Sequence, residues 1–335
     1  MIKHAFSIVI PLYNKEAFVA RCIDSVLAQS KEEFELIVVN DGSTDQSLSI
    51  VSAYRDSRLK IVSQKNKGPG PARNRGVIES SGDWIAFIDA DDIWASDHLE
   101  ELERLINGFD DAGIVSTRST EIRVGKTLPR EKKNAEWNSK RVDYLRQEGL
   151  ESGRINSSSA AVSRAVFDKV GYFRPLCIGE DEEFWVRVCL AYPCAVSNNP
   201  TSFYYRGTGG ITERSWEQQI DRHNTIKSIR DISPAVAYVM DQIEAGNLNK
   251  EMGESAAIYI NSRINLALRI KLYNGRLDGI SKMSDFYMDP LSSRCRIWQY
   301  LARRPRWFLE HLYRVRSFAR LLYRCVAQAT SFAHR

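Results

Sequence analysis

Residues 6–14 read Phe-Ser-Ile-Val-Ile-Pro-Leu-Tyr-Asn, a short apolar run that ends in a polar turn. Such a run is typical of a buried strand, and the apolar stripe over residues 15–29 predicts an amphipathic helix after it. Asn14 is a residue type that favours helix starts, so we expect it to cap this helix. A strand, a polar turn and a helix in this order indicate a sheet covered by helices.

The same unit recurs through the first 110 residues. Strands are predicted over 34–39, 59–63 and 84–88, and helices run from Thr44 or Asp45 to Tyr54, from Pro71 to about Glu79, and after Ser96. Consecutive crossovers of this kind predict a parallel sheet, and ligands of open α/β sheets bind at the carboxyl ends of the strands. The polar segments at those ends are therefore the candidate site: 11–14, 40–45, 66–76 and 89–92.

The pattern after residue 113 is less regular. Residues 125–140 are polar and basic and predict a mobile loop, and the chain reads as helices from about Trp216 onward. Between them we expect strands at 157–163 and 203–206, and helices at 164–170 and 182–191. The predicted organisation is an α/β domain over 1–215, a helical extension over 216–290 and a basic amphipathic helical tail over 291–335.

Composition places the chain among globular proteins. It has 335 residues, of which 43% are hydrophobic and 27% are charged, and this excludes a disordered or low-complexity chain. No apolar run approaches the roughly 20 residues that span a bilayer, and no secretory leader pattern is visible. We therefore expect a cytoplasmic protein. The six cysteines have no zinc-type spacing.

The tail holds the positive charge of the chain. The formal net charge is +5, but residues 291–335 contain ten arginines and one glutamate, so the remainder is net negative. We therefore predict no nucleic-acid partner. Apolar positions recur in the tail at steps of three and four: Phe308, Leu312, Val315, Ala319, Leu322 and Val326. This pattern favours a helix at an anionic membrane surface, on its cytoplasmic face; the alternative is that the stripe packs on protein.

Two carboxylates follow the fourth strand. If the backbone stays extended, Asp89 and Asp91 point to the same side of it. Such a pair suits Mg2+ or Mn2+, which takes few protein oxygens and completes its shell with water and phosphate. The alternative is that these acids only cap the following helix, a role that Ser96 and Asp97 already fill.

Other polar groups at the strand ends allow two interpretations each. Asp41 either belongs to an Asx turn or accepts a hydrogen bond from a nucleobase or ribose. Arg73 follows a glycine-rich loop and can meet an anionic ligand. The four acids of 180–183 either favour a helix start or repel one another, which raises a pKa and yields a general base. Neither GxGxxG nor GxxxxGK[ST] is present, which disfavours a nicotinamide enzyme and a P-loop NTPase.

Taken together, five segments resemble the family 2 glycosyltransferases, inverting enzymes with the GT-A fold that use nucleotide-diphosphate sugars. The segments, in family order, are Ser7 to Asn14, Asn40 to Asp45, Lys67 to Gly76, Ile88 to Asp92 and Gly179 to Arg187. The resemblance implies a GT-A catalytic domain over 1–215, with a Rossmann-like, mostly parallel sheet, and a donor that is a UDP-sugar in many members.

The resemblance also implies roles for individual residues. Asp181 matches the catalytic base, and Asp89 and Asp91 match the DxD motif, with Asp89 toward the ribose and Asp91 on Mn2+ or Mg2+. The residues that would frame the base and ribose are Pro11, Tyr13, Asp41 and Arg73. One departure is that residues 204–214 lack the family's diphosphate-contacting His, so Arg206 or Arg214 would have to replace it.

These roles agree with the chemistry of sugar transfer. A metal neutralises the departing nucleoside diphosphate, and one carboxylate deprotonates an acceptor hydroxyl on the opposite face of the sugar. The predicted acceptor is a glycan or a lipid-linked glycan in bacterial surface polysaccharide biosynthesis. The alternatives are a sugar-nucleotide pyrophosphorylase, which would need a Gly/Arg-rich loop after the first strand, and a non-catalytic sugar-nucleotide binding module.

Overall fold

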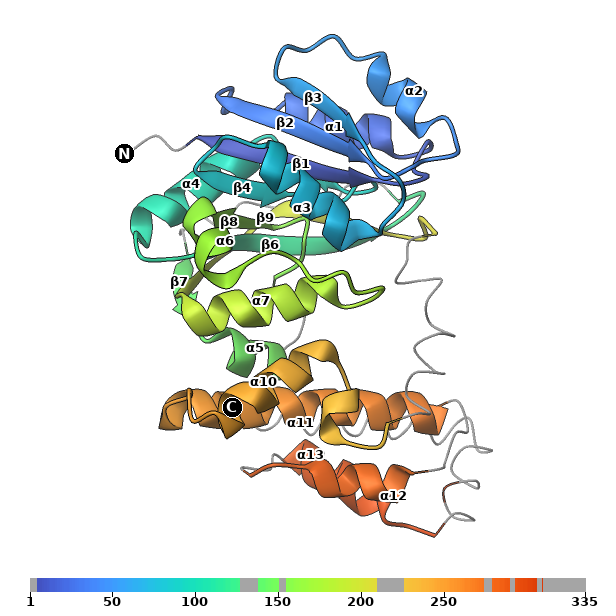
Figure 1. The fold of residues 1–335 in the computed structure, drawn as a ribbon, viewed down its shortest axis with the longest axis vertical. Coiled ribbons are helices and arrows are strands. Elements are labelled where there is room, and N and C mark those ends of the chain that lie inside the picture. Colours follow the sequence, from blue (N-terminus) through green and yellow to red (C-terminus); the bar gives the residue numbers. More distant parts are fainter. Residues whose placement is uncertain are drawn as a thin grey trace. The chain divides into compact units, whose positions relative to one another are not determined.

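The computed structural model describes residues 5–126, 138–150, 155–209, 226–273, 279–289, 293–305 and 309 (Figure 1). The chain divides into two compact units. One comprises Met1–Tyr144 with Gly153–Glu213, and the other comprises Leu145–Ser152 with Arg214–Arg335. The three-part division into 1–215, 216–290 and 291–335 stays a prediction.

Four parallel strands form the first half of the sheet in the first unit. They are β1 (Phe6–Leu12), β2 (Phe34–Asn40), β3 (Leu59–Ser63) and β4 (Trp84–Phe87), in the order β3-β2-β1-β4. Phe6 lies in register with both Phe34 and Trp84. Because the strands are parallel and in register, their carboxyl ends share one edge of the sheet. This confirms the predicted parallel arrangement and brings the polar turns together.

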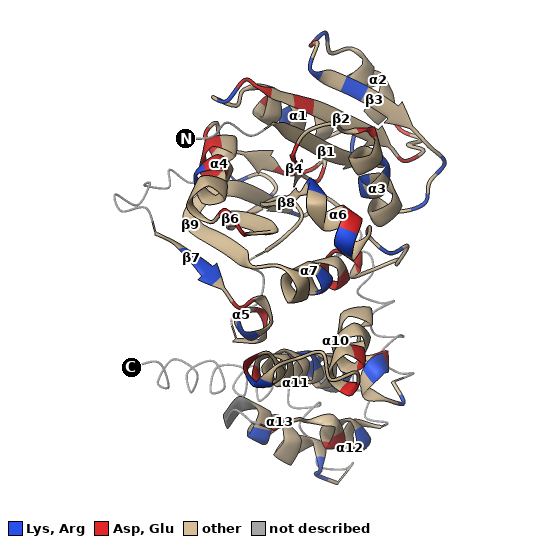
Figure 2. Cartoon of the chain, turned by 60° about the vertical axis from the view of Figure 1, so that its left-hand side comes forward, with Lys and Arg blue, Asp and Glu red and all other residues tan. Residues whose placement is uncertain are grey.

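The second half of the sheet is mixed. Beyond β4 the order continues β8-β6-β9-β5, and β7 pairs with β9. These strands are β5 (Ile93–Trp94), β6 (Ile114–Arg123), β7 (Ser139–Val142), β8 (Ala160–Ser163) and β9 (Cys194–Arg206). β8 runs antiparallel to β4 and β6, whereas β6 and β9 run parallel to each other. The α/β class is confirmed. Because β7 includes Ser139 and Lys140, the loop predicted over 125–140 extends too far; its residues 127–137 lie outside the described part. The Lys and Arg positions of β7 are blue in Figure 2.

Helices cover both faces of the parallel strands (Figure 1). The helices of the first unit are α1 (Val19–Leu27), α2 (Ser47–Ser52), α3 (Pro69–Glu79), α4 (His98–Gly108), α6 (Arg164–Val170) and α7 (Glu180–Ala191). From Leu145 on, α5 (Tyr144–Leu150) belongs to the second unit. Side chains of α1 and α4 share a core with Ile8 and Ile10 of β1. On the other face, Ala72 of α3 packs on Ile37 and Val39. The alternation of strand residues between two apolar faces explains why both are covered.

Gly76 brings α3 very close to the sheet. A Cβ built on Gly76 would lie 2.2 Å from Cγ1 of Val9, a distance that real side chains do not reach. A residue without a side chain is therefore needed where the helix crosses β1.

The helix starts differ from those expected. Asn14 does not cap α1, which begins at Val19, since its Oδ1 instead accepts from the amide of Thr44 at 2.8 Å. α2 follows Gln46 rather than Thr44 or Asp45, α3 begins at Pro69, and α4 follows Asp97. Asn14 thus bonds to a neighbouring turn, whereas Asp45 Oδ1 accepts from the amide of Ser47, the first residue of α2, at 3.0 Å.

The second unit is helical in its described parts. It contains η1 (Ile229–Asp231), α10 (Pro234–Glu244), α11 (Lys250–Tyr273), α12 (Ile280–Met283), η2 (Ser284–Phe286) and α13 (Ser293–Ala302). Asn261 of α11 exchanges two hydrogen bonds with the backbone of Met288, at 2.6 and 2.9 Å. A search of the described helices finds none long and apolar enough to cross a membrane. Most of the predicted tail helix lies outside the described residues.

Candidate functional site

Arg73 lies at the centre of the polar groups at the carboxyl edge of the sheet. It projects from α3 and is 3% exposed. Its Nη2 donates to Asp89 Oδ1 at 2.7 Å, and its Nη1 donates to Glu180 Oε1 at 2.9 Å. A guanidinium presents its N–H groups in a planar fork, so one side chain can fix two carboxylates at once. Arg73 thereby joins the end of β4 to the start of α7.

The carboxylates around Arg73 outnumber its single positive charge. Burial raises the pKa of Asp89, and the neighbouring Asp91 carboxylate adds to that effect, while Arg73 opposes it. Burial and the Asp181 carboxylate likewise raise the pKa of Glu180. Burial alone would lower the pKa of Arg73, but Asp89, Glu180 and Asp181 outweigh it and raise that pKa. Several carboxylates share one guanidinium, and a further cation would be stabilised beside them.

The prediction that four adjacent acids raise at least one pKa is therefore confirmed in its direction for Glu180. The first cause is burial of that carboxylate, and repulsion by Asp181 comes second.

The backbone turns at Asp89 to Asp92, so the expected extended conformation is wrong. β4 ends at Phe87, and the amide of Asp92 donates to the carbonyl of Asp89 at 3.0 Å. Consequently the Asp89 and Asp91 carboxylates take different partners. Asp89 contacts Arg73, and Asp91 Oδ2 accepts from Lys15 Nζ and from Thr208 Oγ1, each at 2.5 Å. Asp91 still lies close enough to affect the pKa of Asp89.

Asp92, the third acid of this turn, has a structural role. It is fully buried, and it accepts from Ser158 Oγ at 2.5 Å and from the amide of Tyr205 at 2.8 Å. Burial raises the pKa of this carboxyl well above its usual range, and Asp89 and Asp91 add to the effect. Asp92 thus ties the turn to the segment before β8 and to the end of β9.

Asp41 is buried beneath the loop that leads into α3. Its carboxylate accepts from Gln64 Nε2 at 2.8 Å and from the backbone amides of Lys67 and Gly68 at 3.0 and 2.8 Å. Three donors on one carboxylate fix the path of residues 64–68. The nucleotide-binding role of Asp41 stays a prediction, and its observed contacts shape the loop beside the site.

The other predicted residues lie around this centre. Tyr13 is 42% exposed directly after β1, and Pro11 is half-buried within that strand. Asp181 is half-buried in the first turn of α7, where its Oδ1 accepts from the amide of Glu182 at 2.8 Å. Arg206 is an exposed side chain whose Nε lies 3.2 Å from Glu121 Oε2. Arg214 lies outside the described residues.

Close packing holds α3 against the segment before α7. A Cβ on Gly70 would lie 3.0 Å from the carbonyl oxygen of Arg174 and 3.2 Å from Cγ of Glu180. The glycine-rich start of α3 therefore lets residues 174–180 approach the helix. The short gap brings Glu180 within reach of Arg73.

Sequence reasoning missed two contacts of this site. The Glu180 contact with Arg73 spans 107 residues, and the Lys15 contact with Asp91 spans 76. Glu180 stood out only as one of four acids, and Lys15 carried no signal beyond its place after the first strand. Long-range pairing of this kind depends on how the strand ends converge, which residue patterns alone do not specify.

Divalent-cation chemistry fits these residues if a ligand completes the shell. Within the described ranges no group of three His, Cys, Asp or Glu side chains converges on one point. Asp89 and Asp91 can offer carboxylate oxygens, and their side chains are 33% and 13% exposed. Mg2+ and Mn2+ sites that bind phosphates use one or two carboxylates and fill the remaining positions with phosphate and water. The donor set matches that kind of site.

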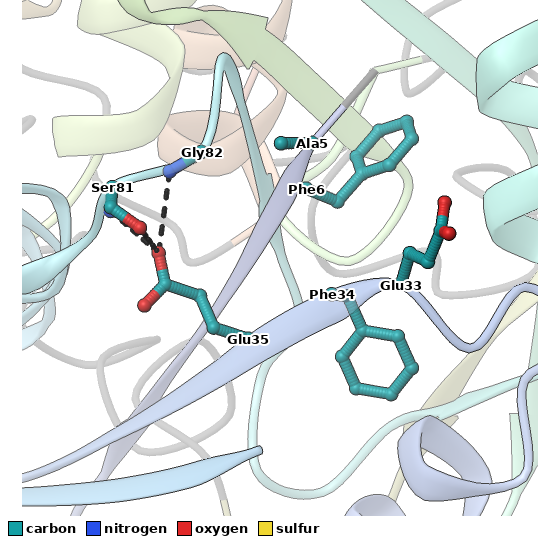
Figure 3. Close-up of a pocket in the computed structure, with 7 residues that line it drawn as sticks. All are labelled: Ala5, Phe6, Glu33, Phe34, Glu35, Ser81 and Gly82. Carbon is teal, nitrogen blue, oxygen red and sulfur yellow. Dashed lines mark hydrogen bonds between the residues drawn. The ribbon is translucent and has the colours of Figure 1, made fainter. Parts of the chain in front are cut away.

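A pocket of about 360 Å3 lies at the opposite end of the strands (Figure 3). It is lined by Ala5, Phe6, Glu33, Phe34, Glu35, Ser81 and Gly82. Burial would raise the pKa of Glu35, but hydrogen bonds from Ser7, Ser81 and Gly82 outweigh it and lower that pKa. Because these residues begin β1 and β2 rather than end them, the pocket is separate from the candidate site.

Comparison with known families identifies most of the first unit. Residues 7–171 match the model of glycosyl transferase family 2. The chain is 42% identical over 98 residues to the uncharacterized glycosyltransferase EpsJ of Bacillus subtilis, a stretch covering 29% of this chain and 28% of EpsJ. It is 35% identical over 108 residues to glycosyltransferase GlyA of Streptococcus pneumoniae, covering 32% of this chain and 16% of GlyA. Across the relatives compared, the matches span 14% to 39% of the relative's own length.

Solved structures share the fold over nearly the whole chain. TarS from S. aureus, residues 1–349, covers 92% of this chain and 91% of its own, with a TM-score of 0.60 and 19% identity. The mannosyltransferase PcManGT from Pyrobaculum calidifontis, in complex with GDP-Man and Mn2+, covers 92% and 85%, with a TM-score of 0.51 and 17% identity. The family match and the shared architecture lead to one assignment: residues 7–171 match glycosyltransferase family 2, and the chain has the GT-A fold.

Proposed function

We propose that this protein is an inverting, metal-dependent glycosyltransferase that moves a sugar from a nucleotide-diphosphate sugar to a hydroxyl of a glycan or lipid-linked acceptor. The observation that carries the proposal is the fork of Arg73 between Asp89 and Glu180. It ties the acidic end of β4 to the helix turn that bears Asp181. A donor held at the strand ends would therefore lie near the carboxylate proposed as the base.

Asp181 is the proposed general base. Its Oδ1 is engaged by the amide of Glu182, and no hydrogen bond to Oδ2 is found among the described residues. Oδ2 can therefore take the proton of the acceptor hydroxyl. The acceptor oxygen then forms a bond to the anomeric carbon while the bond to the diphosphate oxygen breaks, which inverts the configuration at that carbon. The nucleoside diphosphate leaves with the bonding electron pair.

Asp91, together with Asp89, would hold Mn2+ or Mg2+ against the diphosphate, where the ion supplies positive charge for the departing group. The excess of carboxylates over guanidinium groups at this edge supports the proposal. Changing Asp91→Ala should weaken donor binding in Mn2+ and abolish its metal dependence. Full transfer activity in excess chelator would contradict it.

The donor is proposed to be a UDP-sugar. Tyr13 has an exposed ring after β1 that can stack on a base, and the loop anchored by Asp41 lies beside the same edge. TarS has been solved with UDP-GlcNAc, whereas PcManGT has been solved with GDP-Man, so UDP- and GDP-sugars should both be assayed. A thermal-shift panel with and without Mn2+ would identify the donor, since ligand at 100 times its dissociation constant adds about 2.7 kcal/mol.

The acceptor is proposed to be a lipid-linked glycan at the cytoplasmic face of a bacterial membrane, in the assembly of a surface polysaccharide. The support comes from the start of the tail. A hollow of about 410 Å3 on α13 is lined by Arg296, Gln299, Tyr300, Arg303 and Arg304. Tyr300 is 59% exposed, and the Arg304 guanidinium lies 3.7 Å from its ring centroid. Arginines beside an exposed amphipathic ring suit the headgroup region of anionic lipid.

The deciding experiment replaces the proposed base. In Asp181→Asn the side chain keeps its shape but cannot accept the proton, so transfer should fall at least about a hundredfold while donor binding stays nearly unchanged. Glu182→Gln is the matched control, since it removes one negative charge from the same helix turn. If Asp181→Asn retains more than about a tenth of the wild-type rate, Asp181 is not the base.

A further inference from the structure

Lys15 occupies the position at Asp91 that a metal ion would also occupy. Its Nζ lies 2.5 Å from Asp91 Oδ2 and 3.5 Å from the carbonyl oxygen of Thr208. The side chains of Lys15 and Asp91 are 15% and 13% exposed, so water screens this pair only partly. An ammonium and a divalent cation cannot both lie against one carboxylate oxygen without strong repulsion.

The backbone before Lys15 is held in an unusual conformation. Asn14 has a φ of 50° and is the one non-glycine residue among those described with a positive φ. Its amide donates to Ser43 Oγ at 3.2 Å, and the Lys15 amide donates to Ser47 Oγ at 2.8 Å. Left-handed backbone at a non-glycine residue persists where surrounding contacts enforce it, and it is common at functional sites.

Three contacts of Lys15 and one of Asn14 therefore direct the Lys15 side chain. Ser43 accepts from the amide of Asn14, Ser47 accepts from the amide of Lys15, and Asp91 and Thr208 accept from the Lys15 ammonium. A lysine that only improved surface solubility would not need this support, because its side chain would extend into water.

We infer that Lys15 is a built-in cation of the donor site, with two successive partners. Before the donor binds, Lys15 neutralises Asp91. When the nucleoside diphosphate arrives, its ammonium leaves Asp91, which becomes free to hold the metal, and bonds to the diphosphate. This assignment rests on the proposed function, and it makes Lys15 a second positive group for the leaving diphosphate in a chain whose 204–214 segment has no His.

The inference predicts effects of opposite sign for one substitution. Lys15→Met keeps the length of the side chain and removes its charge. Without Lys15, Asp91 should bind Mn2+ about tenfold more tightly in the absence of nucleotide, because the competing ammonium is gone. In metal-free buffer with chelator, the same variant should bind UDP or GDP about fivefold more weakly, because a charge-assisted contact is lost.

Both quantities can be measured on the full chain without an activity assay. Mn2+ binding is followed by the loss of the free-ion electron paramagnetic resonance signal, and nucleotide binding by titration calorimetry with UDP and with GDP. Lys31→Met is the matched control, because Lys31 is also shielded and pairs with Glu103 at 2.8 Å away from Asp91. Adding Asp91→Asn to Lys15→Met should remove the gain in Mn2+ affinity.

Equal Mn2+ affinity of wild type and Lys15→Met, or no Mn2+ binding by either, overturns the inference. If Lys15→Met and wild type bind UDP and GDP equally well in chelator, Lys15 does not bond to the diphosphate. If wild type binds neither UDP nor GDP under any condition, the proposed function fails, and the Mn2+ comparison still decides whether Lys15 competes for Asp91.

Discussion

Asn74 and Phe173 exchange two hydrogen bonds across 99 residues of sequence. Asn74 Nδ2 donates to the carbonyl of Phe173 at 2.8 Å, and the amide of Phe173 donates to Asn74 Oδ1 at 2.9 Å. The Asn74 side chain of α3 thereby pairs with the backbone of the segment before α7 as a neighbouring strand would, with one donated and one accepted hydrogen bond. Phe173 is buried against Phe184 and Trp185, so this bond pair sets where α7 begins relative to α3.

Removing the Asn74 side chain should loosen this segment. In Asn74→Ala both hydrogen bonds are lost, and we expect a decrease of about 2 kcal/mol in the free energy of unfolding. Amide hydrogen exchange should accelerate in residues 171–180 more than in β1 or β2. Asn247→Ala, which removes an exposed side-chain contact with Gln242, is the control and should change stability by less than about 0.5 kcal/mol. Uniform acceleration across the sheet would argue against a local role.

Arg73 is expected to be essential for stability as well as for the site. Arg73→Met leaves Asp89 and Glu180 without their shared counter-charge, and breaking such a buried group costs about 3–5 kcal/mol. Denaturant unfolding measures this loss.

A second variant separates charge from packing. If charge is the cause, adding Glu180→Gln to Arg73→Met should recover part of the lost stability, because one orphaned carboxylate is removed. Additive losses in the double variant would show that packing of the arginine stem accounts for the effect.

The first half of the fold was predictable because each part carries a local signal. The strands at 34–39 and 59–63 agree with β2 and β3 to within one residue, and the helix at 164–170 agrees with α6. Apolar runs bounded by turn residues define such elements without reference to the rest of the chain. Gly171, with a φ of 83°, ends α6 as its position after the periodic segment indicates.

The second half was not predictable in the same way. β6 carries buried polar residues such as Ser116 and Thr117, so it lacks the apolar run that marks a buried strand. Their hydroxyls are satisfied by distant groups, including Ser159 Oγ at 2.9 Å and the His98 ring at 3.4 Å. A buried strand that depends on partners 19 to 43 residues away gives no local pattern.

In the candidate site, too, local patterns predicted where residues lie in the chain but not which distant residues they contact. The motif segments placed Asp89 and Asp91 after the fourth strand and Asp181 at a helix start, but side-chain pairing followed from the tertiary arrangement. The turn from Asp89 to Asp92 separates the partners of two acids that an extended strand would have kept together.

His98 should make stability depend on pH in mildly acidic solution. Burial lowers the pKa of His98 to about 3, against a small opposing effect of its hydrogen bond with Thr201. Between pH 6.5 and pH 3 the unfolded chain binds a proton at His98 that the folded chain does not. The free energy of unfolding should therefore fall as pH decreases through this window, by as much as about 5 kcal/mol.

The variant His98→Gln isolates this contribution, because all other titrating groups are shared with wild type. Gln loses the ring that stacks on Trp94 at 4.1 Å, so the variant should be less stable near pH 7. Its deficit relative to wild type should shrink as pH falls from 6.5. A deficit that stays constant from pH 7 to pH 4 would contradict a neutral, buried His98.

Membrane attachment can be tested without shortening the chain. We expect weaker binding to phosphatidylglycerol vesicles when Arg314, Arg316, Arg320 and Arg324 are changed together to Gln. At roughly 1 kcal/mol per charge, the partition coefficient measured by cosedimentation at low salt should fall about a thousandfold. The control changes four exposed basic residues of the first unit to Gln: Arg123, Lys126, Lys140 and Lys169. Wild-type protein that stays in the supernatant at low salt would exclude a membrane role for the tail.

Gly76 sets the distance between α3 and β1. Because Gly76 has no side chain, its backbone packs directly on the side chain of Val9, and the helix lies closer to β1 than a residue with a Cβ would allow. Arg73 lies one helical turn before Gly76, and from this position its guanidinium contacts Asp89 after β4. Any side chain at residue 76 would lift the helix and lengthen the distance that the guanidinium must span. The distance between the cation and its carboxylate is thus set by a residue that contacts neither of them.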